Sequence, residues 1–159
     1  MNDIIKNNNQ ELSISNLSTK LAIINKLLQV SEKKIINFDT YSDSIDRTLI
    51  KLILKEYYIE SLDSWESLEK FGLYNLKSYK IFICHYRIIW TENDLVKFKN
   101  LIYKNPDINF IVRSMNIDTI ENMFNDIPNV FTLYNLNLDY LRSLVHKCNQ
   151  NNNNFQSIL

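Results

Sequence analysis

The run Lys80-Ile81-Phe82-Ile83-Cys84-His85 is the most strand-like segment of the chain and decides the fold. Its continuous apolar character is typical of a strand buried on both faces of a parallel sheet. Residues 91–102 follow with helical periodicity, and Thr91 with Asp94 resembles a capping box at their start. Asn105-Pro106-Asp107 then breaks the helix. The segment therefore predicts one strand followed by one helix.

The same strand–helix unit repeats on both sides of this segment. Strands are predicted at 34–38, 57–62, 108–113 and 130–134, each followed by a stretch of helical period. Five such units predict an α/β fold with an open, doubly wound parallel sheet. In such sheets, ligands bind at the carboxyl ends of the strands, so a site is expected at that edge.

Polar residues mark the predicted ends of the helices. Asp63 with Glu66, and Asp118 with Glu121, resemble capping boxes. Gly72 is the only glycine of the chain and is well placed to end the helix that follows 57–62.

An extra helix is predicted at 13–31, ahead of the strand–helix units. Its apolar residues recur at alternating steps of three and four and form a stripe of Ile14, Leu17, Leu21, Ile24 and Leu28. Two interpretations stay open. The helix folds back on its own domain, or the stripe joins the chain to a partner or to a second copy as a homodimer.

The predicted organisation has four parts. A disordered tail spans 1–12, the N-terminal helix 13–31, an α/β domain 32–148, and an Asn-rich disordered tail 149–159. A chain of 159 residues is long enough for one domain with a sizeable core and short tails. Short polar tracts at chain ends commonly stay disordered.

Charge and composition exclude several classes of function. Lys plus Arg and Asp plus Glu number 18 each, and there is no basic cluster, so nucleic acid is not an expected partner. A single glycine cannot form a phosphate-binding loop or a dinucleotide fingerprint, and no cofactor is expected. The two cysteines and two histidines lack metal-ligand spacing, so no metal is expected. No signal peptide or membrane segment is predicted, which with two isolated cysteines favours a cytoplasmic protein.

Three segments resemble the receiver domain of two-component response regulators, over roughly 33–147. Residues 57–68 resemble the family's second strand and the start of its second helix. Residues 79–85 lie where the family carries its phosphate-accepting strand, and 134–141 follow the rhythm of its last turn and helix. The resemblance implies a flavodoxin-like sheet, similar to that of chemotaxis proteins, with strand order 2-1-3-4-5.

Receivers accept phosphate on an aspartate that ends the third strand, beside Mg²⁺ held by an acidic pair after the first strand. A Ser or Thr after the fourth strand and a Lys after the fifth bind the new phosphate. The corresponding positions here are Asp39, Thr40, His85, Ser114 and Tyr134. Most of the required residue types are absent, so the resemblance implies a degenerate receiver, or pseudo-receiver, with no catalytic residues.

The resemblance therefore implies a non-phosphorylatable protein–protein interaction module in signalling or regulation, and not an enzyme. Its partner surface is expected at Asp118, Glu121, Asn122, Tyr134, Tyr140 and Arg142. Two alternatives stay open. One is a small-molecule-binding or catalytic domain that uses the crevice at the carboxyl ends of the strands. The other is a structural homo-oligomer subunit assembled through the N-terminal helix.

Overall fold

A computed structural model describes residues 15–26, 33–41, 45–135 and 137–154. The chain divides into two units, Met1–Ser31 and Glu32–Leu159. In the first unit, residues 15–26 form a helix in which Leu17, Leu21 and Ile24 are exposed. Ile14 and Leu28 of the predicted stripe lie outside the described residues, as do the predicted tail at 1–12 and residues 155–159.

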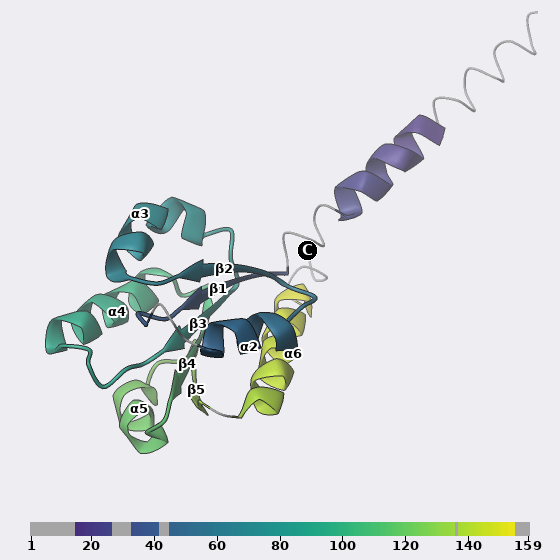
Figure 1. Cartoon of the computed structure of the whole chain (residues 1–159). Helices are drawn as coiled ribbons and strands as arrows, with labels where there is room; N and C mark the ends of the chain where they lie inside the picture. Colours follow the sequence, from purple (N-terminus) through teal and green to yellow (C-terminus); the bar gives the residue numbers. More distant parts are fainter. Residues whose placement is uncertain (1–14, 27–32, 42–44, 136, 155–159) are drawn as a thin grey trace, which may run out of the picture. The chain divides into compact units, whose positions relative to one another are not determined.

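The second unit is built on a five-stranded parallel sheet (Figure 1). Its strands are β1 (Lys34–Phe38), β2 (Tyr58–Leu62), β3 (Ile81–His85), β4 (Asn109–Ser114) and β5 (Val130–Tyr134). They lie in the order β2-β1-β3-β4-β5, which confirms the predicted fold and strand order. All neighbouring strands are parallel, so their carboxyl ends meet at one edge of the sheet.

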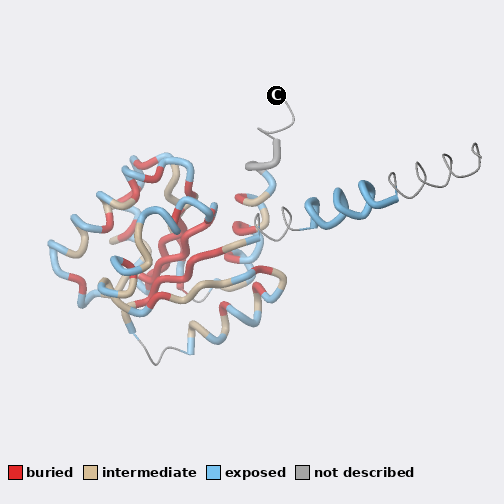
Figure 2. The backbone as a smooth tube through the Cα atoms, turned by 90° about the horizontal axis from the view of Figure 1, so that it is seen from above, coloured by how far each residue is buried: buried red, intermediate tan, exposed pale blue. Residues whose placement is uncertain are grey.

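Helices cover both faces of this sheet. They are α2 (Ile45–Ile53), α3 (Trp65–Leu76), α4 (Glu92–Lys104), α5 (Ile117–Phe124) and α6 (Leu138–Asn154). The helices α3, α4 and α5 pack on one face against Phe38, Phe82 and Phe110. On the other face, α2 and α6 pack against Ile35, Ile83 and Ile111. Figure 2 shows that the buried residues are concentrated along the strands. Successive side chains of a strand point to opposite faces of the sheet, and both faces are covered by helices, so both sets of side chains are buried.

The first turn of α4 forms as predicted, whereas that of α3 does not. Thr91 Oγ1 accepts a hydrogen bond from the Asp94 N–H, and the Asp94 carboxylate accepts one from the Thr91 N–H. In α3 the reciprocal pair is Ser64 with Ser67, and not Asp63 with Glu66. Serine caps helices as well as aspartate does, so the prediction of the α3 capping box is wrong by one residue.

The cap of α5 also differs from the prediction. Asn116 Oδ1 accepts a hydrogen bond from the Thr119 N–H, so Asn116 and not Asp118 begins this helix. Asparagine and aspartate are equally good caps, and the end of β4 at Ser114 places Asn116 at the turn.

Gly72 interrupts α3. It has the non-helical angles φ 76° and ψ 154°, a backbone region that favours glycine, so the first helical segment ends there as predicted, and a second segment continues to Leu76. The helix α6 continues to Asn154, so its helical structure passes the predicted domain end at 148 and enters the predicted disordered tail. Once a helix has formed, each further residue adds a hydrogen bond at little cost, which explains the extension.

Among the described residues, no helix is both long enough and apolar enough to cross a membrane.

Candidate functional site

Three strands carry apolar side chains toward α2 and α6 along most of their length and a polar side chain at their carboxyl ends. On the face covered by α2 and α6, Ile35 is followed two positions later by Asn37, Ile83 by His85, and Ile111 by Arg113. All three polar residues are buried. We define the polar cluster as Asp39, Asp46, His85, Arg87, Arg113 and Asn135. Its residues come from the ends of four strands and the first turn of α2.

Asp39 follows β1 and is held by a guanidinium group. Arg87 Nε donates to Asp39 Oδ1 at 3.1 Å, and Arg87 Nη2 donates to Oδ2 at 2.8 Å. The Tyr41 N–H also donates to Oδ1, at 3.1 Å, and the Arg87 guanidinium lies over the Tyr41 ring. Burial by itself raises the pKa of Asp39, but the contacts with His85, Arg87 and the Tyr41 N–H outweigh it and hold the pKa well below its usual range. Asp39 is therefore a paired carboxylate.

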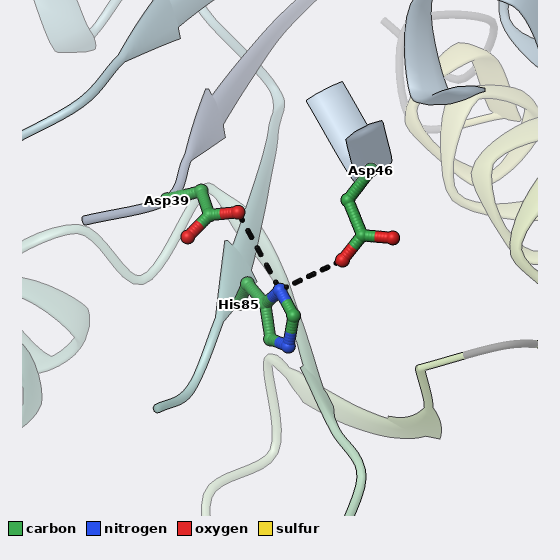
Figure 3. Close-up of side chains that lie close together, drawn as sticks. All are labelled: Asp39, Asp46 and His85. Atoms are coloured by element: carbon green, nitrogen blue, oxygen red, sulfur yellow. Dashed lines mark ion pairs between the residues drawn. The ribbon is translucent and has the colours of Figure 1, made fainter. Parts of the chain in front are cut away.

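His85 ends β3 and lies between two carboxylates (Figure 3). Its Nδ1 lies 3.1 Å from Asp46 Oδ2 and 3.5 Å from Asp39 Oδ2. The imidazole is buried, and Nδ1 is not aligned for a hydrogen bond with any described residue. These contacts bring the ends of β1 and β3 together with the start of α2.

Arg113 is the largest fully buried side chain among the described residues, at 0% exposure. Its Nη2 donates to the Asn135 carbonyl at 2.8 Å and lies 4.0 Å from Asp46 Oδ1. Asn135 Nδ2 donates in turn to Asp46 Oδ2 at 3.1 Å. Burial lowers the pKa of Arg113, and the carboxylates of Asp46 and Asp39 oppose that change. Asp46 therefore joins α2 to the ends of β3, β4 and β5.

The Mg²⁺ that the receiver resemblance implies does not fit this cluster. Asp39, Asp46 and His85 each offer a ligand atom, and these atoms lie within 4.8 Å of one another. However, Arg87 already engages both Asp39 oxygens, and Mg²⁺ favours oxygen ligands over imidazole nitrogen. The two carboxylates are matched by two guanidinium groups, so an added divalent cation would bring uncompensated positive charge into a buried site.

The structure brings some of the predicted phosphorylation-site positions together and not others. Asp39 and His85 are neighbours, as their positions after β1 and at the end of β3 predict. Thr40 Oγ1 instead accepts from the Trp90 indole at 3.3 Å, and Ser114 Oγ accepts from the Asn116 N–H at 3.1 Å. Tyr134 is paired in register with Ser114 and is exposed. Among the residues that the structure describes, neither the Thr40 hydroxyl nor the Ser114 hydroxyl forms a hydrogen bond with His85.

Four members of the cluster were not identified from the sequence: Asp46, Arg87, Arg113 and Asn135. Arg113 could have been identified as a site residue, because it is a charged residue that directly follows the apolar run Phe110-Ile111-Val112. A buried charge needs a partner. The other three lie in loops or in a helix, where polar residues are ordinary.

The predicted partner surface lies on α5 and α6. Asp118, Glu121, Asn122 and Tyr140 are exposed there. Arg142 is also exposed, and its Nη2 lies 3.4 Å from Glu56 Oε1. These residues are accessible, as an interaction surface requires.

Several solved structures are similar to this one. A protein described as pilus assembly-related, from Burkholderia pseudomallei K96243, matches with TM-score 0.59 at 9% identity, over 76% of this chain and 91% of that chain. A response regulator receiver domain from Clostridium thermocellum matches with TM-score 0.57 at 17% identity, over 77% and 98%. A response regulator from Thermotoga maritima matches with TM-score 0.54 at 20% identity, over 74% and 97%.

Comparison of the sequence with known protein families and with curated proteins gives no match. The structural similarity, together with the strand order β2-β1-β3-β4-β5, establishes that this chain has the fold of a response regulator receiver domain.

Proposed function

We propose that this chain is a receiver-like protein–protein interaction module in signalling that does not accept phosphate. The observation that carries the proposal is the two-point contact of Arg87 with Asp39. This guanidinium occupies the side of the carboxylate that a divalent cation would need. The residue that ends β3 is His85, which cannot form an aspartyl phosphate. Two of the similar structures are response regulator proteins, which supports the signalling context.

A phosphoryl mimic tests the first part of the proposal. We expect that Mg²⁺ with beryllofluoride leaves the amide NMR spectrum of the full chain unchanged around Asp39, His85 and Ser114. The matched variant carries His85→Asp and Arg87→Ser together, which removes the internal cation and supplies a carboxylate at the end of β3. Saturable shifts in the unaltered chain would disprove the non-phosphorylatable assignment.

The partner surface is proposed on the side formed by α5, β5 and α6. Its support is the exposure of Asp118, Glu121, Asn122 and Tyr140. A photo-crosslinking amino acid in place of Tyr140 should capture a partner protein in extracts of the source cell. The same amino acid in place of Tyr74, which is 89% exposed on α3, is the control. Capture from both positions alike would count against a specific surface on α6.

A second candidate function is self-association through the N-terminal helix. Leu17, Leu21 and Ile24 are 60%, 52% and 50% exposed, and an apolar stripe of this kind favours a helix partner. If the stripe joins two copies, replacing Leu21 and Ile24 with Gln should halve the mass measured by light scattering. Ser18→Gln on the same helix is the control. An unchanged monomer in all three proteins would exclude this candidate.

A further inference from the structure

A groove lies between α3 and α4, on the sheet face opposite to α2 and α6. Its volume is about 400 Å³, which is within the range of small-molecule sites. Four of its nine lining residues are leucines: Leu68, Leu73, Leu76 and Leu101. The polar atoms come mainly from Glu69, Lys97, Asn100 and Lys104.

The break at Gly72 shapes this groove. Because Gly72 has φ 76°, the second half of α3 departs from the path of the first half. A Cβ atom added at Gly72 would meet nothing within 4 Å, so the groove is open at this point. Leu68 and Leu76 are buried, while Leu73 is 49% exposed. The floor is therefore apolar, and a groove of about 400 Å³ is suited to a small molecule with an alkyl chain rather than to a helix about 10–12 Å across.

The charge along the groove is positive on the α4 side. Lys97 and Lys104 are two helical turns apart, about 10 Å along α4. Lys97 Nζ lies 3.6 Å from Glu69 Oε1, so an acidic group already faces it. Lys104 makes no ion pair with any other residue that the structure describes. An anionic group therefore has its best position at the Lys104 end.

We infer that this groove binds a small anionic amphiphile, namely an alkyl carboxylate whose chain covers the leucines and whose head contacts Lys104. Binding of the alkyl chain is favourable because it removes apolar surface from water. Binding of the carboxylate is favourable because it forms a charge-assisted contact with the Lys104 ammonium group. This inference goes beyond the proposed function, because the groove uses α3 and α4 while the proposed partner surface uses α5 and α6.

The direct test is an amide NMR titration of the full chain with dodecanoate below its micelle concentration. We expect saturable shifts confined to α3 and α4, around Leu73, Asn100 and Leu101. Dodecanol has the same chain without the charge and should bind about two- to five-fold more weakly, the range expected for an exposed ion pair. Dodecyltrimethylammonium carries the opposite charge and should bind more weakly still.

Two exposed positions give variants that should fold normally. Lys104→Gln should lower the affinity for dodecanoate to that for dodecanol, and Asn100→Trp should weaken the binding of both by narrowing the groove. Lys147→Gln removes one exposed charge from α6, on the other face of the sheet, and should leave the affinity unchanged.

Three results would overturn the inference: no saturable shifts with dodecanoate, shifts outside α3 and α4, or equal affinity for all three amphiphiles. Saturation by an acidic amphipathic peptide without any binding of dodecanoate would also overturn it, because the groove would then bind a protein segment.

Discussion

Arg87 donates two hydrogen bonds to Asp39, from Nε to Oδ1 at 3.1 Å and from Nη2 to Oδ2 at 2.8 Å. The carboxylate that follows β1 is thereby neutralised by a side chain from the loop after β3. A guanidinium matches both oxygens of a carboxylate in a fixed geometry, which a hydrated metal ion does not.

Removing this guanidinium should weaken the fold and open the site to a cation. Arg87→Ser leaves a buried carboxylate without its main partner, so the free energy of unfolding should fall by about 3 kcal/mol. Mn²⁺ should then raise the melting temperature of this variant and not that of the unaltered protein, because Asp39, Asp46 and His85 become available as ligands. Arg142→Ser removes an exposed ion pair and serves as the control. Equal stabilisation of both proteins by Mn²⁺ would contradict the role given to Arg87.

Stability should depend on the ionisation of Asp39 in acid. The pKa of this carboxyl is lowered in the folded state, so its contribution is complete above the ordinary aspartate pKa of about 3.9 and is lost as the pH falls below it. In that window the free energy of unfolding should fall by about 1.4 kcal/mol per pH unit for this proton. Urea denaturation should show the difference between the unaltered protein and Asp39→Asn shrinking as the pH falls. Asn122→Ala, at an exposed position of α5, changes no ionisable group and should show no such trend.

Arg113 should couple energetically to Asp46. Arg113→Met removes a buried charge whose Nη2 lies 4.0 Å from Asp46 Oδ1, and it should destabilise the protein by about 3–5 kcal/mol. Adding Asp46→Asn should recover part of this loss, since the unmatched carboxylate disappears. The measurement is a double-mutant cycle by urea denaturation, with Arg142→Met as the exposed control. Strict additivity of the two changes would contradict the coupling.

Both thiols should react slowly in the folded protein. Burial raises the pKa of Cys148 to about 11 and that of Cys84 well above its ordinary value, with the Asp39 carboxylate adding to the effect at Cys84. The thiolate is the reactive form, so alkylation near neutral pH should be slow until the protein unfolds. Ser143→Cys supplies an exposed thiol on α6 as the comparison, and mass spectrometry reports the labelling. Cys148 labelled as fast as that thiol would show that α6 opens locally.

The sheet was predictable because local patterns specify it. Lys34–Phe38 and Val130–Tyr134 are predicted with their observed bounds, and the other strands differ by one residue. A buried parallel strand needs a continuous apolar run, and each run stands between turn residues. Helix caps were harder, because neighbouring polar residues compete for the same turn. Ser64 and Asp63 are adjacent and both suit a cap, and the chemistry of the residues does not separate them.

The polar cluster was predictable only in part, for a different reason. Asp39 and His85 could be predicted as site residues, because each lies at or directly after the carboxyl end of a predicted strand. Arg87 and Asp46 belong to the cluster because they contact residues that are distant along the chain, as Arg87 contacts Asp39. No local periodicity encodes such a contact, and it depends on the loop after β3 turning back toward β1.

The strand order has a consequence for the order of events in folding. Once the chain extends past β3 to Arg87, it holds both carboxylates of the cluster, Asp39 and Asp46, but only one of the two guanidinium groups of the cluster. The second arrives with Arg113 in β4, and the carbonyl that it contacts belongs to Asn135, after β5. A buried charge without its partner is costly, so a partly synthesised chain that ends before β4 gains little by closing this edge of the sheet. The cluster therefore ties stable folding of the first three strands to the arrival of the last two.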